Sequence, residues 1–303
     1  MRTSETSEKW KGIILAGGTG SRLFPLTHVV NKHLLPVYDK PMIYYPLATL
    51  MLSGVRDFII ISSPESLDLF EVLLGDGRKW GISITYLAQT SAGGIAQSLI
   101  IAADEITGCN VALALGDNIF YGASLPLLLK QAMAMNVGAT IFGYEVSNPS
   151  AFGVVVLDDA GHPIDLEEKP KIIRSRLAVP GLYFYDERAV AIARELQPSA
   201  RGELEITDVN RAYLTAGDLT VRLFGRGVAW LDGGTHRDLY EASQFIKVIE
   251  ERTGLKVACP EEVAWRMGFI SRTAFERLID SDPVTDYQRY LHELIKVTPP
   301  RRE

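Results

Sequence analysis

The chain has 303 residues, of which 47% are hydrophobic and 22% are charged. This is the balance of an ordinary soluble globular protein, and the length suffices for one large α/β domain. The formal net charge of −6 argues against a nucleic-acid-binding protein, because phosphate contacts require a basic excess. Residues 1–8 lack the apolar core of a signal peptide, and no apolar run reaches the length of a membrane span. We therefore expect a cytoplasmic protein that binds neither nucleic acid nor membranes.

The chain contains two cysteines, Cys109 and Cys259. They lie far apart and show no metal-ligand spacing, so neither a disulfide framework nor a zinc site is predicted. We expect both to be inert buried thiols.

Apolar strands alternate with helices through the first half of the chain. The sequence predicts strands at 11–16, 57–62, 83–88, 111–115 and 139–145, with helices near 42–52 and from Pro64, Gly94 and Leu125. Strands that read as near-continuous apolar runs are buried on both faces, which is typical of a parallel sheet covered by helices. This half is therefore predicted to be a doubly wound, mostly parallel α/β sheet.

The pattern changes after Gly153. Short strands at 153–157, 163–168 and 181–185 suggest antiparallel additions to the same sheet. Helices at 187–195 and 205–216, strands at 219–224 and 228–231, and helices from Thr235 onward follow, with a short extended piece at 255–258. No linker or repeat interrupts the chain. We expect a polar tail at 1–10, an α/β domain at 11–240 and a helical extension at 241–303.

Three glycines, Gly17, Gly18 and Gly20, directly follow the first buried strand. Such a turn lets backbone N–H groups approach an anion closely, although an ordinary tight turn explains the glycines equally well. A dinucleotide fingerprint lacks its third glycine here, and a Walker A motif lacks Gly-Lys-Ser/Thr. Arg22 and Lys32 stand beside the turn and could neutralise the charge of a triphosphate. Without the turn beside them, both would be interpreted as ordinary solvated surface charges.

A set of segments, taken in chain order, resembles the sugar nucleotidylyltransferases. The stretch at 37–47 is similar to one branch in particular, the glucose-1-phosphate thymidylyltransferases that begin dTDP-rhamnose and deoxysugar synthesis. The matching segments cover almost the whole chain: 15–23, 32–36, 37–47, 115–118, 166–170, 181–186, 201–208, 230–232 and 259–262. The resemblance implies a nucleotidyltransferase of the Rossmann-like α/β class that forms dTDP-glucose and pyrophosphate from dTTP and glucose-1-phosphate.

The resemblance also implies a metal site and a set of catalytic cations. Asp117 and Asp232 each follow an apolar strand, where open α/β sheets place ligand-binding groups, and by resemblance they hold Mg²⁺. Either aspartate alone would read as a turn or helix cap. Arg22, Lys32 and Lys169 are the implied catalytic residues. No general base is expected, because the attacking sugar phosphate is already ionised at neutral pH.

The resemblance assigns the remaining site residues to the two substrates. For Gln89 the chemistry fits, since its amide both donates to and accepts from the imide edge of thymine or uracil. The implied nucleotide-binding residues are Gly17, Gly18, Gly20, Gln89 and Gly94. The implied sugar-phosphate-binding residues are Phe152, Gly153, Glu168, Lys169, Val179 and Arg201.

Members of the family are commonly tetramers with a feedback site near their subunit contacts. Lys256, Glu262 and Arg266 match parts of that site, which implies a regulatory role and a homotetramer. The spacing of Glu262 and Arg266 is also what a surface i,i+4 pair would give.

The chain departs from the family around the sugar site. Phe152 replaces a tyrosine, Pro180 a threonine and Gly233 a threonine, and 92–94 is Ala-Gly-Gly where the family has Pro-Asp-Gly. These changes fit either drift or a pocket for a modified sugar-1-phosphate. Use of UTP and a non-catalytic nucleotide-sugar-binding subunit also stay open, whereas a glycosyltransferase is disfavoured because 115–118 has one acidic residue rather than an Asp-x-Asp motif.

Overall fold

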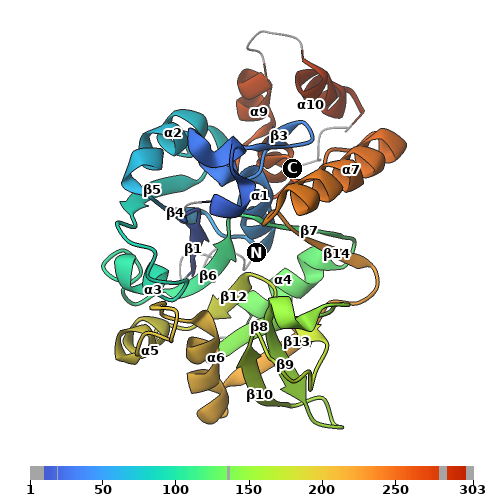
Figure 1. Ribbon diagram of the computed structural model, residues 1–303. Coiled ribbons are helices and arrows are strands. Elements are labelled where there is room, and N and C mark those ends of the chain that lie inside the picture. The colour runs from blue at the N-terminus through green and yellow to red at the C-terminus, as the bar shows by residue number, and fades with distance from the viewer. Residues whose placement is uncertain (1–9, 19, 135–136, 280–284, 298–303) are drawn as a thin grey trace.

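A ten-stranded sheet forms the centre of the computed structural model, which describes residues 10–18, 20–134, 137–279 and 285–297 (Figure 1). The predicted polar tail at 1–10 lies outside the described residues, except for Trp10 at the start of the first strand. The strands of the sheet are β1 (Trp10–Leu15), β4 (Asp57–Ser62), β5 (Ser83–Ala88), β6 (Asn110–Leu115), β8 (Ala139–Glu145), β9 (Gly153–Leu157), β10 (Pro163–Glu168), β11 (Leu177–Ala178), β12 (Leu182–Tyr185) and β13 (Leu219–Leu223).

The strands run in the order β10-β9-β11-β8-β12-β6-β1-β4-β5, with β13 beside β8. Neighbours among β6, β1, β4 and β5 are parallel, and β13 is parallel to β8. Strand β12 is antiparallel to both of its neighbours, and β9, β10 and β11 also pair antiparallel. The predicted class, a doubly wound and mostly parallel sheet with antiparallel additions, is confirmed.

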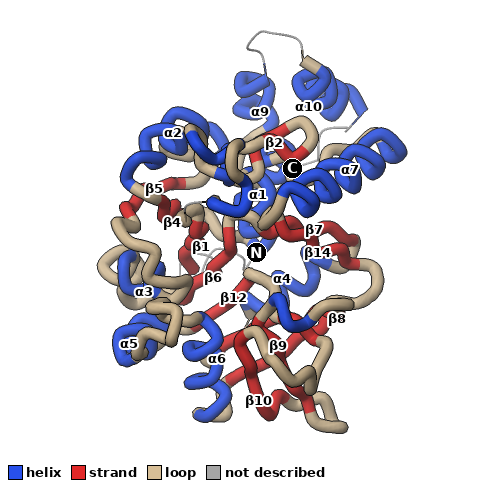
Figure 2. The backbone as a smooth tube through the Cα atoms, in the orientation of Figure 1, coloured by secondary structure: helices blue, strands red, loops and turns tan. Residues whose placement is uncertain are grey.

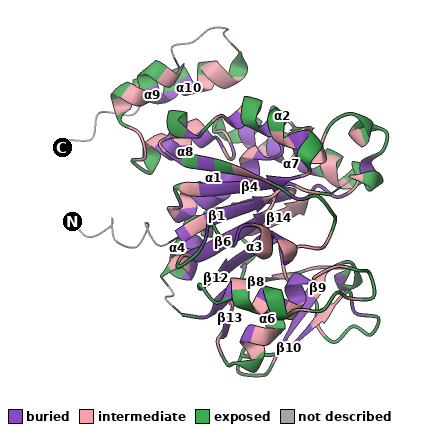
Figure 3. Ribbon diagram, turned by 90° about the vertical axis from the view of Figure 1, so that its left-hand side faces the viewer, coloured by how far each residue is buried: buried purple, intermediate pink, exposed green. Residues whose placement is uncertain are grey.

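Helices cover both faces of the sheet because successive strand residues point to opposite sides. Ile14 and Ile60 pack toward α1 (Tyr44–Ser53), α2 (Pro64–Leu74) and α4 (Leu125–Met133), whereas Ile13 and Ile59 pack toward α3 (Gln97–Ile101), α5 (Ala189–Glu195) and α6 (Ile206–Thr215). Figure 3 shows the buried strands between these layers. Helix α3 begins later than predicted, because Gly94 has a φ of 97° that a right-handed helix excludes.

Two strands outside the main sheet form a separate ribbon. They are β7 (Asn118–Gly122) and β14 (Val228–Asp232), which pair antiparallel next to the long helix α7 (His236–Thr253) (Figure 2). The sequence analysis did not predict β7, which begins after a two-residue turn at Gly116 and Asp117. A second small pair, β2 (Pro36–Val37) and β3 (Lys40–Pro41), was also not predicted.

The C-terminal region is helical, as predicted from Thr235, and gathers at one end of the molecule near α2 and β3 (Figure 1). Its further helices are α8 (Pro260–Arg266), α9 (Arg272–Ile279) and α10 (Asp286–Val297), while 280–284 and 298–303 of the predicted extension lie outside the described residues. The extended piece predicted at 255–258 is wrong: it is a bend in which Ala258 adopts a φ of 53°. Within the described ranges, no helix has both the length and the apolar character needed to cross a membrane.

Short 3₁₀ helices complete the fold: η1 (Ser21–Leu23), η2 (Leu26–His28), η3 (Lys32–Leu34), η4 (Arg78–Trp80) and η5 (Pro149–Ala151). Both cysteines are free thiols, but only Cys259 is buried. Cys109 is partly exposed because it lies in the turn that precedes β6.

Candidate active site

A cavity of about 330 Å³ lies beside the junction of β6 and β7, between β14 and the N-terminus of α6. It brings together side chains from segments far apart in the sequence, from Arg22 to Asp232. The predicted site residues that line it are Arg22, Asp117, Phe152, Gly153, Glu168, Lys169, Val179, Arg201 and Asp232.

A second cavity of about 370 Å³ is lined by Gly18 and Gln89 and by the loop that holds η2. Gln89 is almost fully buried, and its Nε2 donates a hydrogen bond of 2.8 Å to Oε1 of Gln97. Gly17 lies against the Gln89 amide oxygen so closely that a Cβ there would collide with it. Gly94 packs on the backbone of Leu204 and allows no side chain either.

The two aspartates of the predicted metal site meet through the β7–β14 ribbon. Asp232 is the last residue of β14 and lies opposite Asn118, the first residue of β7. The backbone N–H of Gly233 donates to the carbonyl oxygen of Asp117 at 3.0 Å. Asp232 therefore reaches the carboxyl end of β6 from an accessory ribbon. The sequence predicts instead that it follows a strand of the main sheet.

The environments of the two carboxylates differ. Burial, together with the charges of Asp117 and Asp238, raises the pKa of Asp232 to about 6. Burial also acts to raise the pKa of Asp117, but the charges of Lys32 and His33 and hydrogen bonds outweigh it and hold that pKa at about 2. Lys32 forms an ion pair with Asp117 Oδ2, and Asn118 Nδ2 donates to Asp117 Oδ1 at 2.9 Å.

These residues fit a hard divalent cation. The Oδ1 atom of Asp232 is buried and has no hydrogen-bond partner among the residues that the structure describes. A Cβ on Gly234 would lie 2.7 Å from that oxygen and 3.5 Å from Nη2 of Arg22, so glycine keeps the space beside them open. Across the described ranges, no group of three or more acidic, histidine or cysteine side chains is arranged as a metal site. Two carboxylates that leave the other ligands to phosphate and water are typical of Mg²⁺.

The loop that carries Lys32 is tied to the end of β1. Asn31 accepts a hydrogen bond from the backbone N–H of His33 at 3.0 Å and caps η3. Its Nδ2 donates to the carbonyl oxygen of Ala16 at 3.1 Å. Gly20 adopts a φ of 59° just before the turn that carries Arg22, which is an exposed side chain. The glycine turn thus places Arg22, and the contacts of Asn31 place Lys32, near the paired aspartates.

Lys169 is exposed and has a φ of 45°, a left-handed conformation that costs about 1 kcal/mol or more in a residue with a side chain. Its backbone N–H donates to the carbonyl oxygen of Phe152 at 3.0 Å. Next to it, Glu168 accepts a hydrogen bond of 2.6 Å from the hydroxyl of Thr207, and Gly153 packs against both side chains. These contacts hold the end of β10 against α6.

Several other residues of the cavity were not singled out from the sequence, among them Asn118, Thr207 and Trp230. Asn118 Oδ1 accepts hydrogen bonds from Trp230 Nε1 at 2.7 Å and from the backbone N–H of Gly181 at 3.0 Å. The period of two along a strand puts Trp230 on the same face as Asp232, and this signal could have found it.

The departures from the family occupy different places. Phe152 lines the cavity, and its ring centroid lies 5.0 Å from that of Trp230. Pro180 is buried beside the wall residue Gly181, and Gly233 is buried against Met42. Of these three positions, Phe152 is the one with a side chain on the lining of the cavity.

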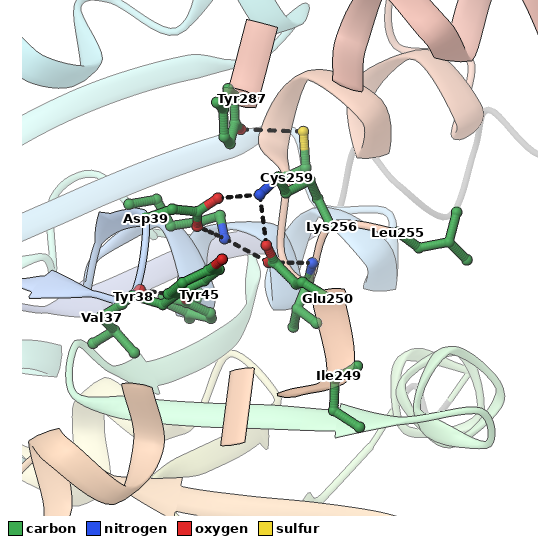
Figure 4. Close-up of polar contacts among 12 residues, drawn as sticks. Val37, Tyr38, Asp39, Tyr45, Ile249, Glu250, Leu255, Lys256, Cys259 and Tyr287 are labelled. Atoms are coloured by element: carbon green, nitrogen blue, oxygen red, sulfur yellow. Dashed lines mark hydrogen bonds and ion pairs between the residues drawn. The ribbon is translucent and has the colours of Figure 1, made fainter. Parts of the chain in front are cut away.

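Lys256, Glu262 and Arg266 line a separate cavity of about 330 Å³ between α1, α4, α8 and β7. Lys256 Nζ forms ion pairs with Asp39 and, at 2.7 Å, with Glu250 (Figure 4). Arg266 Nε donates to Glu262 Oε1 at 2.6 Å, which is the i,i+4 pair that the spacing indicated. The structure therefore gathers the three predicted regulatory residues on one surface.

Comparisons with known proteins agree with this geometry. A family model described as nucleotidyl transferase matches residues 11–248. A glucose-1-phosphate thymidylyltransferase of Neisseria meningitidis serogroup A is 53% identical, over 94% of this chain and 99% of the relative, and one of Xanthomonas campestris pv. campestris is 54% identical, over 94% and 97%.

Solved structures point the same way. A Bacillus anthracis protein assigned as a glucose-1-phosphate thymidylyltransferase and solved with sucrose is 43% identical, with a TM-score of 0.72 over 78% of this chain and 94% of that one. A UDP-glucose pyrophosphorylase solved with UDP-glucose is 24% identical, has a TM-score of 0.69 over 79% of this chain and 98% of that one, and shares the fold. The chain therefore belongs to the nucleotidyl transferase family, in the branch of the glucose-1-phosphate thymidylyltransferases.

Proposed function

We propose that this enzyme joins dTTP to glucose-1-phosphate and forms dTDP-glucose and pyrophosphate, the first step of dTDP-rhamnose or deoxysugar synthesis. The observation that carries the proposal is one cavity whose lining brings the cationic side chains of Arg22, Lys169 and Arg201 together with the paired aspartates Asp117 and Asp232. Relatives that bear this activity in their names are more than half identical to the chain over nearly its full length.

The chemistry depends on positioning and charge stabilisation. Lys169 and Arg201 orient the sugar phosphate so that one of its oxygens attacks the α-phosphorus of dTTP in line. The bond from the α-phosphorus to the bridging oxygen breaks, and the electron pair leaves with pyrophosphate. Arg22 and Lys32 stabilise the charge that develops on the nucleotide and the leaving group. Mg²⁺ held by Asp117 and Asp232 would neutralise further phosphate charge.

The test is pyrophosphate release in the presence of Mg²⁺, with dTTP or UTP and a panel of sugar-1-phosphates. Release that requires both substrates, with the highest kcat/KM for dTTP and glucose-1-phosphate, supports the proposal. No release from any pair would overturn it and favour a nucleotide-sugar-binding subunit without turnover.

A different preferred sugar is the alternative that a specific observation favours. Phe152, where the family has tyrosine, stands on the cavity wall next to Trp230 and offers no hydroxyl to a sugar. If a modified sugar-1-phosphate gives a higher kcat/KM than glucose-1-phosphate, Phe152→Tyr should shift the ratio back toward glucose.

We also propose that the cavity lined by Lys256, Glu262 and Arg266 binds a nucleotide-sugar end product as a feedback site. Two cations on its wall suit a diphosphate.

The same family pattern leads us to propose a homotetramer, which light scattering would test. We also propose a cytoplasmic enzyme, since nucleoside triphosphates are available in the cytoplasm.

A further inference from the structure

Arg201 lies on the wall of the active-site cavity in the loop before α6. Glu205 contacts its guanidinium along one edge. Nε donates to Glu205 Oε1 at 3.2 Å, and Nη2 lies 2.8 and 2.7 Å from the two carboxylate oxygens. Such a two-point contact fixes the plane of a guanidinium, which a single ion pair does not.

Glu205 is itself held in place. It is 8% exposed, and the hydroxyl of Ser199 donates to its Oε1 at 2.7 Å. Although Glu205 is the N-cap residue of α6, its side chain makes no capping hydrogen bond. The carboxylate points toward the Arg201 loop instead, so it does not stabilise the start of the helix.

The contact leaves one group of Arg201 available. Within the described part of the chain, Nη1 donates no hydrogen bond, whereas Nη2 also lies 3.5 Å from Glu168 and 3.4 Å from Glu203. Without Glu205, the flexible side chain could turn to either of these carboxylates. A guanidinium that is already fixed loses less conformational entropy when a phosphate binds than one that samples several partners.

We propose that Glu205 is a positioning residue that holds the Nε–Nη2 edge of Arg201 and so presents Nη1 to the phosphate of the sugar-1-phosphate. The inference rests on the proposed function, which makes Arg201 a sugar-phosphate ligand. A lysine at 201 would carry its charge on a single rotatable ammonium, whose direction a contact with Glu205 does not fix as it fixes a planar guanidinium.

The experiment compares Glu205→Gln with Glu203→Gln, which removes the partly exposed carboxylate 3.4 Å from the same guanidinium. We expect Glu205→Gln to raise the KM for glucose-1-phosphate about tenfold while the KM for dTTP changes less than about twofold. Glu203→Gln should change both by less than about twofold. In an Arg201→Ala background, Glu205→Gln should have no further effect, since it acts through the missing guanidinium.

An equal rise in both KM values, an unchanged KM for glucose-1-phosphate, or the same loss in the Arg201→Ala background would overturn the inference. Thermal unfolding checks that each variant is folded. If Glu205→Gln does not fold, Ser199→Ala takes its place, because it removes the hydrogen-bond donor to Glu205. We expect it to raise the KM for glucose-1-phosphate about threefold. A wild-type enzyme that releases no pyrophosphate would instead overturn the proposed function, and the inference with it.

Discussion

Removing the charge of Asp232 should change activity and stability in opposite directions. Its Oδ1 atom is buried without a hydrogen-bond partner among the described residues, and its carboxylate faces the charge of Asp117. We expect Asp232→Asn to lower kcat/KM about 100-fold or more, because charge stabilisation on the phosphates is lost. In the absence of metal, the same variant should be as stable as the wild type or about 1 kcal/mol more stable, because a buried repulsion is removed.

Pyrophosphate release and thermal unfolding in a chelating buffer measure the two effects. Asn118→Asp, which adds a carboxylate beside the pair, should lower the melting temperature instead. A marked fall in the melting temperature of Asp232→Asn would show that the carboxylate is a structural anchor and contradict the prediction.

Gly17 determines the position of Gln89, the predicted base-reading residue. A Cβ at position 17 would collide with the amide oxygen of Gln89, which is the flexible end of a side chain and can move. We expect Gly17→Ala to raise the KM for dTTP between about tenfold and 100-fold, because a displaced amide no longer meets the base. Gly225→Ala, at a position with no atom within contact distance, is the control and should leave the KM unchanged. A Gly17→Ala enzyme with a wild-type KM would mean that Gln89 does not read the base.

At the scale of elements, a cluster of four charges joins the β2–β3 hairpin to the end of α7 (Figure 4). Lys40 and Glu250 are almost fully buried and 2.9 Å apart, and Lys256 bridges Glu250 and Asp39. Removing one charge from such a cluster leaves the others uncompensated. We expect Lys256→Met to lower the free energy of unfolding by about 3 kcal/mol. Lys247→Met, which breaks an exposed pair with Glu251, should change it by less than about 0.5 kcal/mol.

The effect of Lys256→Met should depend on pH. Burial acts to raise the pKa of Asp39, but Lys40 and Lys256 outweigh it and lower that pKa, so the contribution of Asp39 is complete above about pH 4 and lost as pH falls. Burial acts to lower the pKa of Lys256, but Asp39 and Glu250 raise it overall, so its contribution is lost only above about pH 10. Denaturant titrations should show a constant difference from wild type near neutrality that shrinks below pH 4. A constant difference down to pH 3 would contradict this.

How far the sequence predicts the molecule differs between elements. The apolar runs of β1, β4 and β6 identified the main sheet, because burial on both faces leaves a continuous pattern. The β7–β14 ribbon was not predicted, since its pairing depends on residues more than a hundred positions apart. The same limit applies to the site: Asp117, Glu168 and Asp232 were named, but Asn118 and Thr207 were not. Their contacts with Trp230 and Glu168 join elements far apart in the chain and have no local signal.

At the scale of the whole molecule, the β7–β14 ribbon touches both the active-site cavity and the cavity of the proposed feedback site. Asn118 lines the first, and Phe120 to Gly122 line the second, about 10 Å further along the same strand. On the partner strand, Asp232 lies opposite Asn118, and Val228 lies opposite Gly122. A ligand that shifts the far end of this ribbon therefore has a direct physical connection to a carboxylate of the proposed metal site.

This arrangement predicts that inhibition and catalysis can be separated by mutation. Arg266→Ala removes a cation from the feedback cavity but touches no residue of the active site, so kcat and both KM values should stay within about twofold of wild type without inhibitor. Inhibition by dTDP-rhamnose should weaken about tenfold or more, whereas Arg252→Ala, at the exposed end of α7, should leave it unchanged. Coupling between sites is reciprocal, so saturating dTTP should weaken the binding of dTDP-rhamnose to wild type by the factor with which the inhibitor weakens dTTP binding. If Arg266→Ala retains full inhibition, or if inhibition is purely competitive at the active site, the second cavity is not the feedback site.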